Sequence, residues 1–120
     1  MPVTLDLFQK KIQEGTSIWL FTTKLCPDCR RLKVFFPELI THYPHFYYEE
    51  VDAEESSELA YHLGIYGVPS MVAFHRGLEI ARYASRLPKP REQVEQFLKR
   101  VQQIASALDE TFAEKKGESS

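Results

Sequence analysis

With 120 residues, the chain is long enough for one globular domain with an apolar core and too short for two stable ones. Its 43% apolar and 12% aromatic residues argue against a disordered or fibrous protein. The formal net charge of −2 argues against nucleic-acid binding, and no stretch approaches the roughly 18 apolar residues that a membrane-spanning helix needs.

The chain begins with a short helix that leads into a strand. Apolar residues recur at helical spacing between Thr4, a suitable N-cap, and Gly15, which ends the pattern. These apolar residues are Leu5, Phe8 and Ile12. Residues 17–22, SIWLFT, then form an unbroken apolar run, which predicts a central strand covered on both faces.

A second helix is predicted to begin near Pro27 and to be stopped by Pro44. Its apolar residues mark one face at helical spacing, and they are Leu32, Phe35, Phe36, Leu39, Ile40 and Tyr43. Pro37 lies inside this helix, where it removes one backbone hydrogen bond. We therefore expect the helix to bend at Pro37 without breaking.

The remaining elements are predicted as two further strand regions and two helices. They are a strand over 46–52, a short helix over 57–63, a hairpin with arms at 70–75 and 79–83, and a long amphipathic helix from Pro90 to Leu108. Gly64 closes the short helix, and Arg76 and Gly77 form the hairpin turn. This order predicts an α/β fold, with one domain over 1–108 and a polar, flexible tail over 109–120.

Cys26 and Cys29 are the only cysteines, and they follow the predicted central strand. Active sites of open α/β sheets gather beyond this end of the strands. Cys26 precedes the helix that starts at Pro27, so free amide groups and the helix dipole should lower its pKa. Pro27 suits the first helical position because its missing N–H has no helical partner.

The spacing of the two cysteines allows a redox cycle. Cys29 lies one turn beyond Cys26 on the same side of the helix, within reach of a disulfide. The thiolate of Cys26 can attack a substrate disulfide, and Cys29 can then displace the reduced substrate. Because residues 1–15 lack a signal-peptide core, we expect a cytoplasmic protein, where such a pair is redox-active or metal-binding rather than structural.

A metal site and inert buried cysteines are the other two interpretations of the pair. Together with His42 and His45, the cysteines have the spacing C-x2-C-x12-H-x2-H, which is close to that of a zinc finger. However, the histidine gap is one residue short, and the predicted helix would place about 20 Å between the cysteines and His42. A four-ligand site within one chain is thereby excluded, whereas a metal shared by two chains stays an alternative.

The segment IYGVPSMVAF, over 65–74, joins the cysteine motif in a wider resemblance. In order and spacing, the chain from about residue 5 to 108 closely resembles the thioredoxin family. This resemblance implies a three-layer α/β/α fold with a mixed sheet of four to five strands, Cys26 as nucleophile and Cys29 as resolving thiol. It also implies that Pro69 is a cis-proline facing the cysteines, and an extended substrate would then pair with Val68 as an added strand.

Three positions depart from the family's pattern. Leu25 stands where thioredoxins usually carry a tryptophan, so that this substrate-contacting position lacks its aromatic ring. Leu20 stands where they carry a buried acid, which leaves the proton acceptor of Cys29 open. The motif is CPDC, and we hypothesise that Asp28 partly replaces this acid and raises the Cys26 pKa by repulsion. The alternative is a solvated Asp28 that stabilises the helix dipole.

These observations predict a cytoplasmic thiol-disulfide oxidoreductase that reduces protein disulfides as a monomer. We expect it to bind no cofactor, metal, nucleic acid or membrane. The resemblance implies electrons from a thioredoxin reductase or a small thiol. A glutaredoxin-like activity agrees with Pro27, but the hairpin region lacks that family's Gly-Gly pair and following Asp. The competing class is a non-catalytic binding module that holds partners through the loop at Val68 and Pro69.

Overall fold

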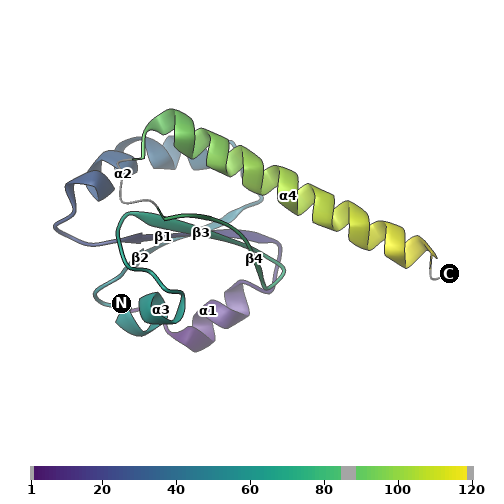
Figure 1. Cartoon of the computed structure of the whole chain (residues 1–120), viewed down its shortest axis with the longest axis horizontal. Coiled ribbons are helices and arrows are strands. Elements are labelled where there is room, and N and C mark those ends of the chain that lie inside the picture. The colour runs from purple at the N-terminus through teal and green to yellow at the C-terminus, as the bar shows by residue number, and fades with distance from the viewer. Residues whose placement is uncertain (1, 85–88, 119–120) are drawn as a thin grey trace.

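The computed structural model describes residues 2–84 and 89–118 (Figure 1). These residues form four helices and four strands in the predicted order. They are α1 (Leu5–Lys11), β1 (Thr16–Thr22), α2 (Pro27–Ile40), β2 (Tyr47–Asp52), α3 (Ser57–His62), β3 (Ser70–His75), β4 (Leu78–Tyr83) and α4 (Arg91–Glu118).

The four strands form one mixed sheet in the order β2-β1-β3-β4. Strand β1 pairs in parallel with β2 and antiparallel with β3, and β4 is antiparallel to β3. Helices α2 and α4 cover one face of the sheet, and α1 and α3 cover the other (Figure 1). The predicted three-layer α/β/α architecture and the predicted central position of β1 are therefore confirmed.

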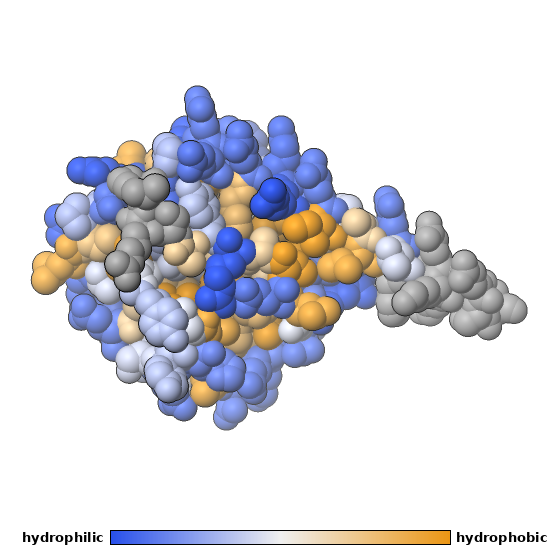
Figure 2. Space-filling model, viewed as in Figure 1, coloured by the Kyte–Doolittle hydropathy of each residue, from blue (hydrophilic) through white to orange (hydrophobic). Residues whose placement is uncertain are grey.

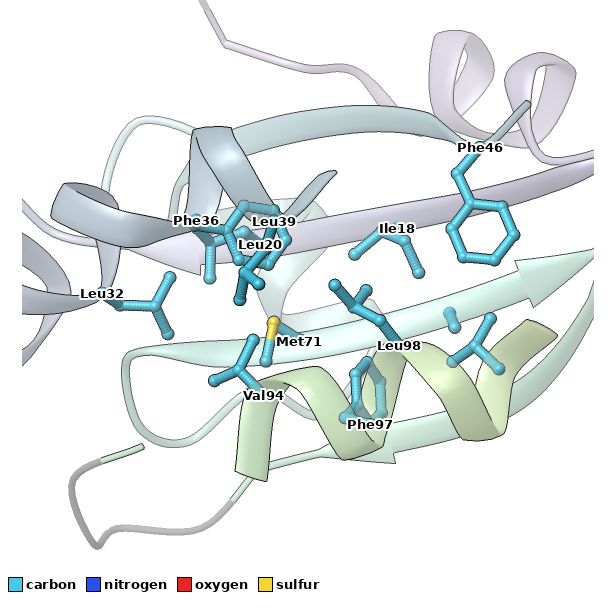
Figure 3. Close-up of a cluster of buried hydrophobic side chains, with 12 residues drawn as sticks. Ile18, Leu20, Leu32, Phe36, Leu39, Phe46, Met71, Val94, Phe97 and Leu98 are labelled. Atoms are coloured by element: carbon cyan, nitrogen blue, oxygen red, sulfur yellow. The ribbon is translucent and has the colours of Figure 1, made fainter. Parts of the chain in front are cut away.

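Strand β1 supplies both halves of the core because successive side chains of a strand point to opposite faces. Ile18 and Leu20 belong to the cluster between the sheet and helices α2 and α4 (Figure 3). Trp19 and Phe21 belong to the cluster on the other face. All four side chains are fully buried, which stabilises the fold by about 1.5–3 kcal/mol for each.

Helix α2 ends at Ile40, earlier than predicted. From Thr41 to Tyr43 the backbone N–H groups donate to carbonyls three residues earlier, at 3.0–3.2 Å, which closes the helix in a tight turn. The ring of Tyr43 then stacks on Phe46, with ring centroids 5.1 Å apart, and packs against the same core cluster as Leu39. Pro37 lies within α2 without ending it, and the bend at this proline stays a prediction.

The hairpin between β3 and β4 has the predicted turn. Arg76 and Gly77 have φ values of 50° and 89°, both in the left-handed region that two-residue hairpin turns require. The turn is held against the segment after α1, since the N–H of Gly77 donates to the Ile12 carbonyl at 2.7 Å. The sheet end with this turn lies opposite the end at which β1 leads into α2.

Helix α4 continues beyond the predicted limit of Leu108 and reaches Glu118. Its C-terminal part projects past the sheet (Figure 1), and apolar surface lies along the junction of β4 and α4 (Figure 2). The backbone of 109–118 is thus helical, while the flexibility of 109–120 and the domain limit at 108 stay predictions. None of the helices in the described part of the chain is long and apolar enough to cross a membrane.

Candidate active site

Cys26 caps the N-terminus of α2. Its backbone is extended, with φ −90° and ψ 111°, and its Sγ accepts a hydrogen bond from the Cys29 N–H at 3.1 Å. Pro27 is the first residue of the helix, as predicted from its missing N–H. The sulfur therefore takes the place that a serine or aspartate oxygen usually occupies, where N–H groups and the helix dipole favour negative charge.

The two sulfurs differ in access to solvent. Cys26 is partly exposed, whereas Cys29 is 1% exposed, and both are free cysteines. An attacking sulfur has to reach a disulfide on another protein, and a resolving sulfur has to reach only its neighbour. The difference in burial suits Cys26 to attack and Cys29 to resolution.

The thiol of Cys29 strongly retains its proton. Burial raises the pKa of Cys29 to about 12, and the hydrogen bond with the Cys26 side chain adds to this effect. A backbone hydrogen bond at Thr23 and the positive charge of Lys33 act in the opposite direction. Cys29 is therefore a thiol at neutral pH in the reduced protein, and its proton has to leave before it can attack.

The loop before β3 faces the accessible sulfur. The Val68–Pro69 peptide bond is cis, and the Sγ of Cys26 lies 3.8 Å from the Val68 carbonyl oxygen. The hydroxyl of Ser70 donates to the Gly67 carbonyl at 2.6 Å and holds the loop closed on itself. The structure thus brings Val68 and Cys26 together across 42 residues of sequence.

One large side chain next to Cys26 in the sequence and another in the loop before Pro69 are open to solvent. Leu25, directly before Cys26, is 85% exposed, and Tyr66, two residues before Val68, is 89% exposed. Sequence reasoning singled out Leu25 and missed Tyr66. The available signal was an aromatic residue inside the loop that leads to Pro69.

Asp28 lies in the first turn of α2 and pairs with a cation. Its Oδ1 accepts a hydrogen bond from Arg31 Nη1 at 3.0 Å, and its side chain is 32% exposed. The carboxylate therefore shares its charge with Arg31 on the same helix. The role predicted for Asp28 in the chemistry of Cys26 stays a hypothesis.

Lys89, which sequence reasoning also missed, is buried beside this turn. It is 5% exposed, and its Nζ lies 4.9 Å from the centre of the Tyr83 ring. It lines a hollow of about 480 Å³ together with Asp28, Arg31, Phe35 and Pro90. Sequence spacing gives no signal for this burial, because it arises where the start of α4 packs against α2.

The proposed zinc ligands are not brought together. Across the described part of the chain, no three His, Cys, Asp or Glu side chains are placed to share a metal ion. His42 and His45 follow the C-terminus of α2, whereas the cysteines lie at its N-terminus. The 14-residue helix between them spans about 20 Å.

The comparisons with known proteins agree on one family. Residues 1–100 match the family model described as Thioredoxin. A thioredoxin H-type from Fagopyrum esculentum is 30% identical over 78 residues, which cover 64% of this chain and 67% of that protein. The NADPH-dependent thioredoxin reductase 3 of Arabidopsis thaliana is 34% identical over 74 residues, 61% of this chain but only 14% of that longer protein.

Solved structures agree with the fold. Thioredoxin from Trypanosoma brucei brucei superposes with a TM-score of 0.75 at 17% identity, covering 86% of this chain and 90% of that one. Mitochondrial thioredoxin 3 from Saccharomyces cerevisiae, in its oxidised form, gives 0.67 at 22% identity, covering 77% and 88%. At these identities the likeness concerns the fold alone.

Proposed function

This chain belongs to the thioredoxin family, and from that membership we propose that it reduces protein disulfides through a cycle of Cys26 and Cys29. The general class, thiol-disulfide oxidoreductase, follows from the family together with the Cys-x-x-Cys motif. The direction of the reaction and the substrate class are the proposal. The observation that carries it is the N-cap position of Cys26, with the Cys29 N–H 3.1 Å from its sulfur.

The first step uses the exposed sulfur. The Cys26 thiolate attacks one sulfur of the substrate disulfide, whose S–S bond breaks, and the other substrate sulfur leaves with the electron pair. A mixed disulfide between Cys26 and the substrate results. The helix N-terminus favours this chemistry because it stabilises the attacking thiolate and holds it at the surface.

The second step uses the buried sulfur. Cys29 gives up its proton and attacks the Cys26 sulfur, so that the bond to the substrate breaks and the substrate leaves as a dithiol. The protein pair is then oxidised to a disulfide, and the substrate has gained two electrons and two protons. Reduction of the Cys26–Cys29 disulfide by a thiol donor closes the cycle.

Substrate binding in this proposal uses the loop that faces Cys26. An extended chain next to the sulfur would pair with the Val68 backbone as an added strand, while Pro69 shapes the loop and Leu25 offers an apolar contact. Main-chain pairing of this kind suits many protein sequences. A thioredoxin reductase or a small thiol is proposed as the electron donor, and a cytoplasmic monomer as the working form.

The second candidate function is a binding module that keeps the fold without the catalytic cycle. Leu20, which is fully buried where the family usually carries an acid, favours this candidate. The module would hold partners through Val68 and Pro69 and would turn over no disulfide.

Reduction of insulin disulfides by a small-thiol donor separates the two candidates. Wild type is expected to accelerate the reduction, and Cys26→Ser is expected to lose the acceleration. Cys29→Ser, the matched control, keeps the attacking sulfur and is expected to accumulate a mixed disulfide that mass spectrometry detects. No acceleration by wild type, and no adduct with Cys29→Ser, would contradict the reductase and favour the binding module.

A further inference from the structure

The resolving step requires a negative charge on the buried sulfur of Cys29. Cys29 has to lose a strongly held proton, and the position where the family places a buried acid holds Leu20. Leu20 packs among apolar side chains of the core, including Met71 and Val94 (Figure 3). No carboxylate can act from this position, so any electrostatic assistance has to come from another part of the site.

Lys89 is a buried cation on this side of the molecule. It lies two residues before α4, which covers the same sheet face as α2, and only 5% of its surface is exposed. Burial of an ammonium group costs free energy unless nearby groups compensate. The Tyr83 ring, 4.9 Å from the Nζ, provides one such group through a cation–π contact.

Negative groups of the cysteine helix provide further compensation. Burial lowers the pKa of Lys89, and the charge of Asp28, followed by those of Cys29 and Cys26, opposes this shift. Asp28 lines the same hollow and is already paired with Arg31 at 3.0 Å. Lys89 therefore lies beside the first turn of the helix that carries both cysteines.

Lys33, which lowers the pKa of Cys29, is better solvated than Lys89. Its side chain is 43% exposed and pairs with Glu50 at 3.1 Å. Solvent and the carboxylate screen much of its charge. Solvent therefore screens the charge of the buried Lys89 less than it screens the charge of Lys33.

We propose that Lys89 is a positioning residue of the resolving step, whose ammonium stabilises the thiolate that Cys29 forms to attack the mixed disulfide. This inference rests on the proposed function. In the step, a bond forms between the Cys29 and Cys26 sulfurs and the bond from Cys26 to the substrate breaks. The electron pair goes to the substrate sulfur, which also takes up the proton that Cys29 has lost.

The timing of this assistance follows from the charges. In the reduced protein, the Cys26 sulfur accepts the hydrogen bond from the Cys29 N–H and shares the field of Lys89. In the mixed disulfide, Cys26 carries no charge, so the field of Lys89 acts on Asp28 and Cys29 but no longer on Cys26. The stabilisation is therefore largest in the intermediate in which Cys29 has to ionise.

Stopped-flow reaction of the reduced protein with dithiobis-nitrobenzoate tests this inference. Attack by Cys26 releases one coloured nitrobenzoate thiolate, and displacement by Cys29 releases a second one from the mixed disulfide. With the reagent in excess, the second phase reports the resolving step. Its rate is measured between about pH 5 and pH 9 for wild type and for Lys89→Met, which keeps an unbranched apolar chain of similar length.

Lys89→Met is expected to slow the second phase about three- to tenfold at each pH, because its rate–pH profile moves upward by up to about one unit. Lys89→Arg keeps the charge and is expected to stay within about twofold of wild type. Lys99→Met is the matched control, because it removes the same charge from an exposed site on α4 and should change neither phase. Lys89→Gln provides a second neutral variant in case Lys89→Met does not fold.

Different outcomes overturn the inference and the proposed function. A folded neutral variant with the wild-type rate and pH profile in the second phase overturns the role of Lys89 alone. A wild type that releases only one equivalent of thiolate has no resolving step, which overturns both. A second phase that is slowed as much by Lys89→Arg as by Lys89→Met indicates a packing effect, and it also contradicts the electrostatic role.

Discussion

The Nε2 of His75, at the end of β3, lies 2.8 Å from the Oδ1 of Asp109 on α4. The Nδ1 of the same ring lies 2.9 Å from the hydroxyl of Thr16, at the start of β1. The imidazole is buried and joins two strands to the helix that projects beyond the sheet. This contact lies at the end of β1 remote from the cysteines, so it concerns stability rather than redox chemistry.

Asp109→Ala is expected to lower the free energy of unfolding by about 1 kcal/mol near pH 7, because the carboxylate is half-exposed and partly screened. The hydrogen bond with His75 lowers the pKa of Asp109, as does the nearby charge of Arg76. Its stabilisation is therefore present above the ordinary aspartate value near 3.8 and is lost as the pH falls through the lower folded-state pKa.

Urea unfolding of wild type and Asp109→Ala at several pH values measures this difference. The two proteins should converge at pH values below the lowered folded-state pKa of Asp109, where the carboxyl group is protonated in both states. Glu110→Ala removes the neighbouring exposed carboxylate and serves as control. A difference between wild type and Asp109→Ala that persists in acid would contradict the electrostatic origin.

Alkylation should distinguish the two cysteines. Because burial and the contact with Cys26 raise the pKa of Cys29 to about 12, iodoacetamide near pH 7 is expected to modify Cys26 at least about a hundredfold faster. Peptide mass spectrometry measures both rates in the reduced protein. In denaturant the rates should become similar, and equal rates in the native protein would show that Cys29 is neither buried nor held as a thiol.

Tyr66 is expected to contact protein substrates because its ring is 89% exposed in the loop that faces Cys26. Tyr66→Ala should raise the KM for insulin about two- to fivefold, through loss of apolar contact area. Its reaction with dithiobis-nitrobenzoate should stay unchanged, since this small reagent needs no such contact. Tyr61→Ala, which removes an 84% exposed tyrosine from α3, is the matched control. Equal effects of the two substitutions on KM would contradict a specific role.

Much of the fold could be predicted because local patterns agree with the tertiary structure. The apolar run of β1 is unbroken because both of its faces are covered, and the Gly77 turn needs a conformation that glycine adopts easily. The end of α2 could not be predicted in this way. Tyr43 continues the helical spacing, but its ring packs on Phe46 in the turn that follows.

The part of the site that lies within one segment of the chain could be predicted from the sequence. The CPDC motif lies between a strand and a helix, so the N-cap position of Cys26 follows from local rules. Lys89 lies 60 residues after Cys29 in the sequence, and its burial depends on how α4 packs against α2. A lysine is almost always exposed, so only the structure distinguishes this one.

The burial of Cys29 also bears on how the protein withstands oxidants. A peroxide that arrives from solvent meets the sulfur of Cys26 first and converts it to a sulfenic acid. The shielded neighbour can condense with this group, releasing water and leaving the same intramolecular bond that the proposed cycle produces. Oxidation of the exposed sulfur therefore ends in a disulfide, which a reductant can reverse.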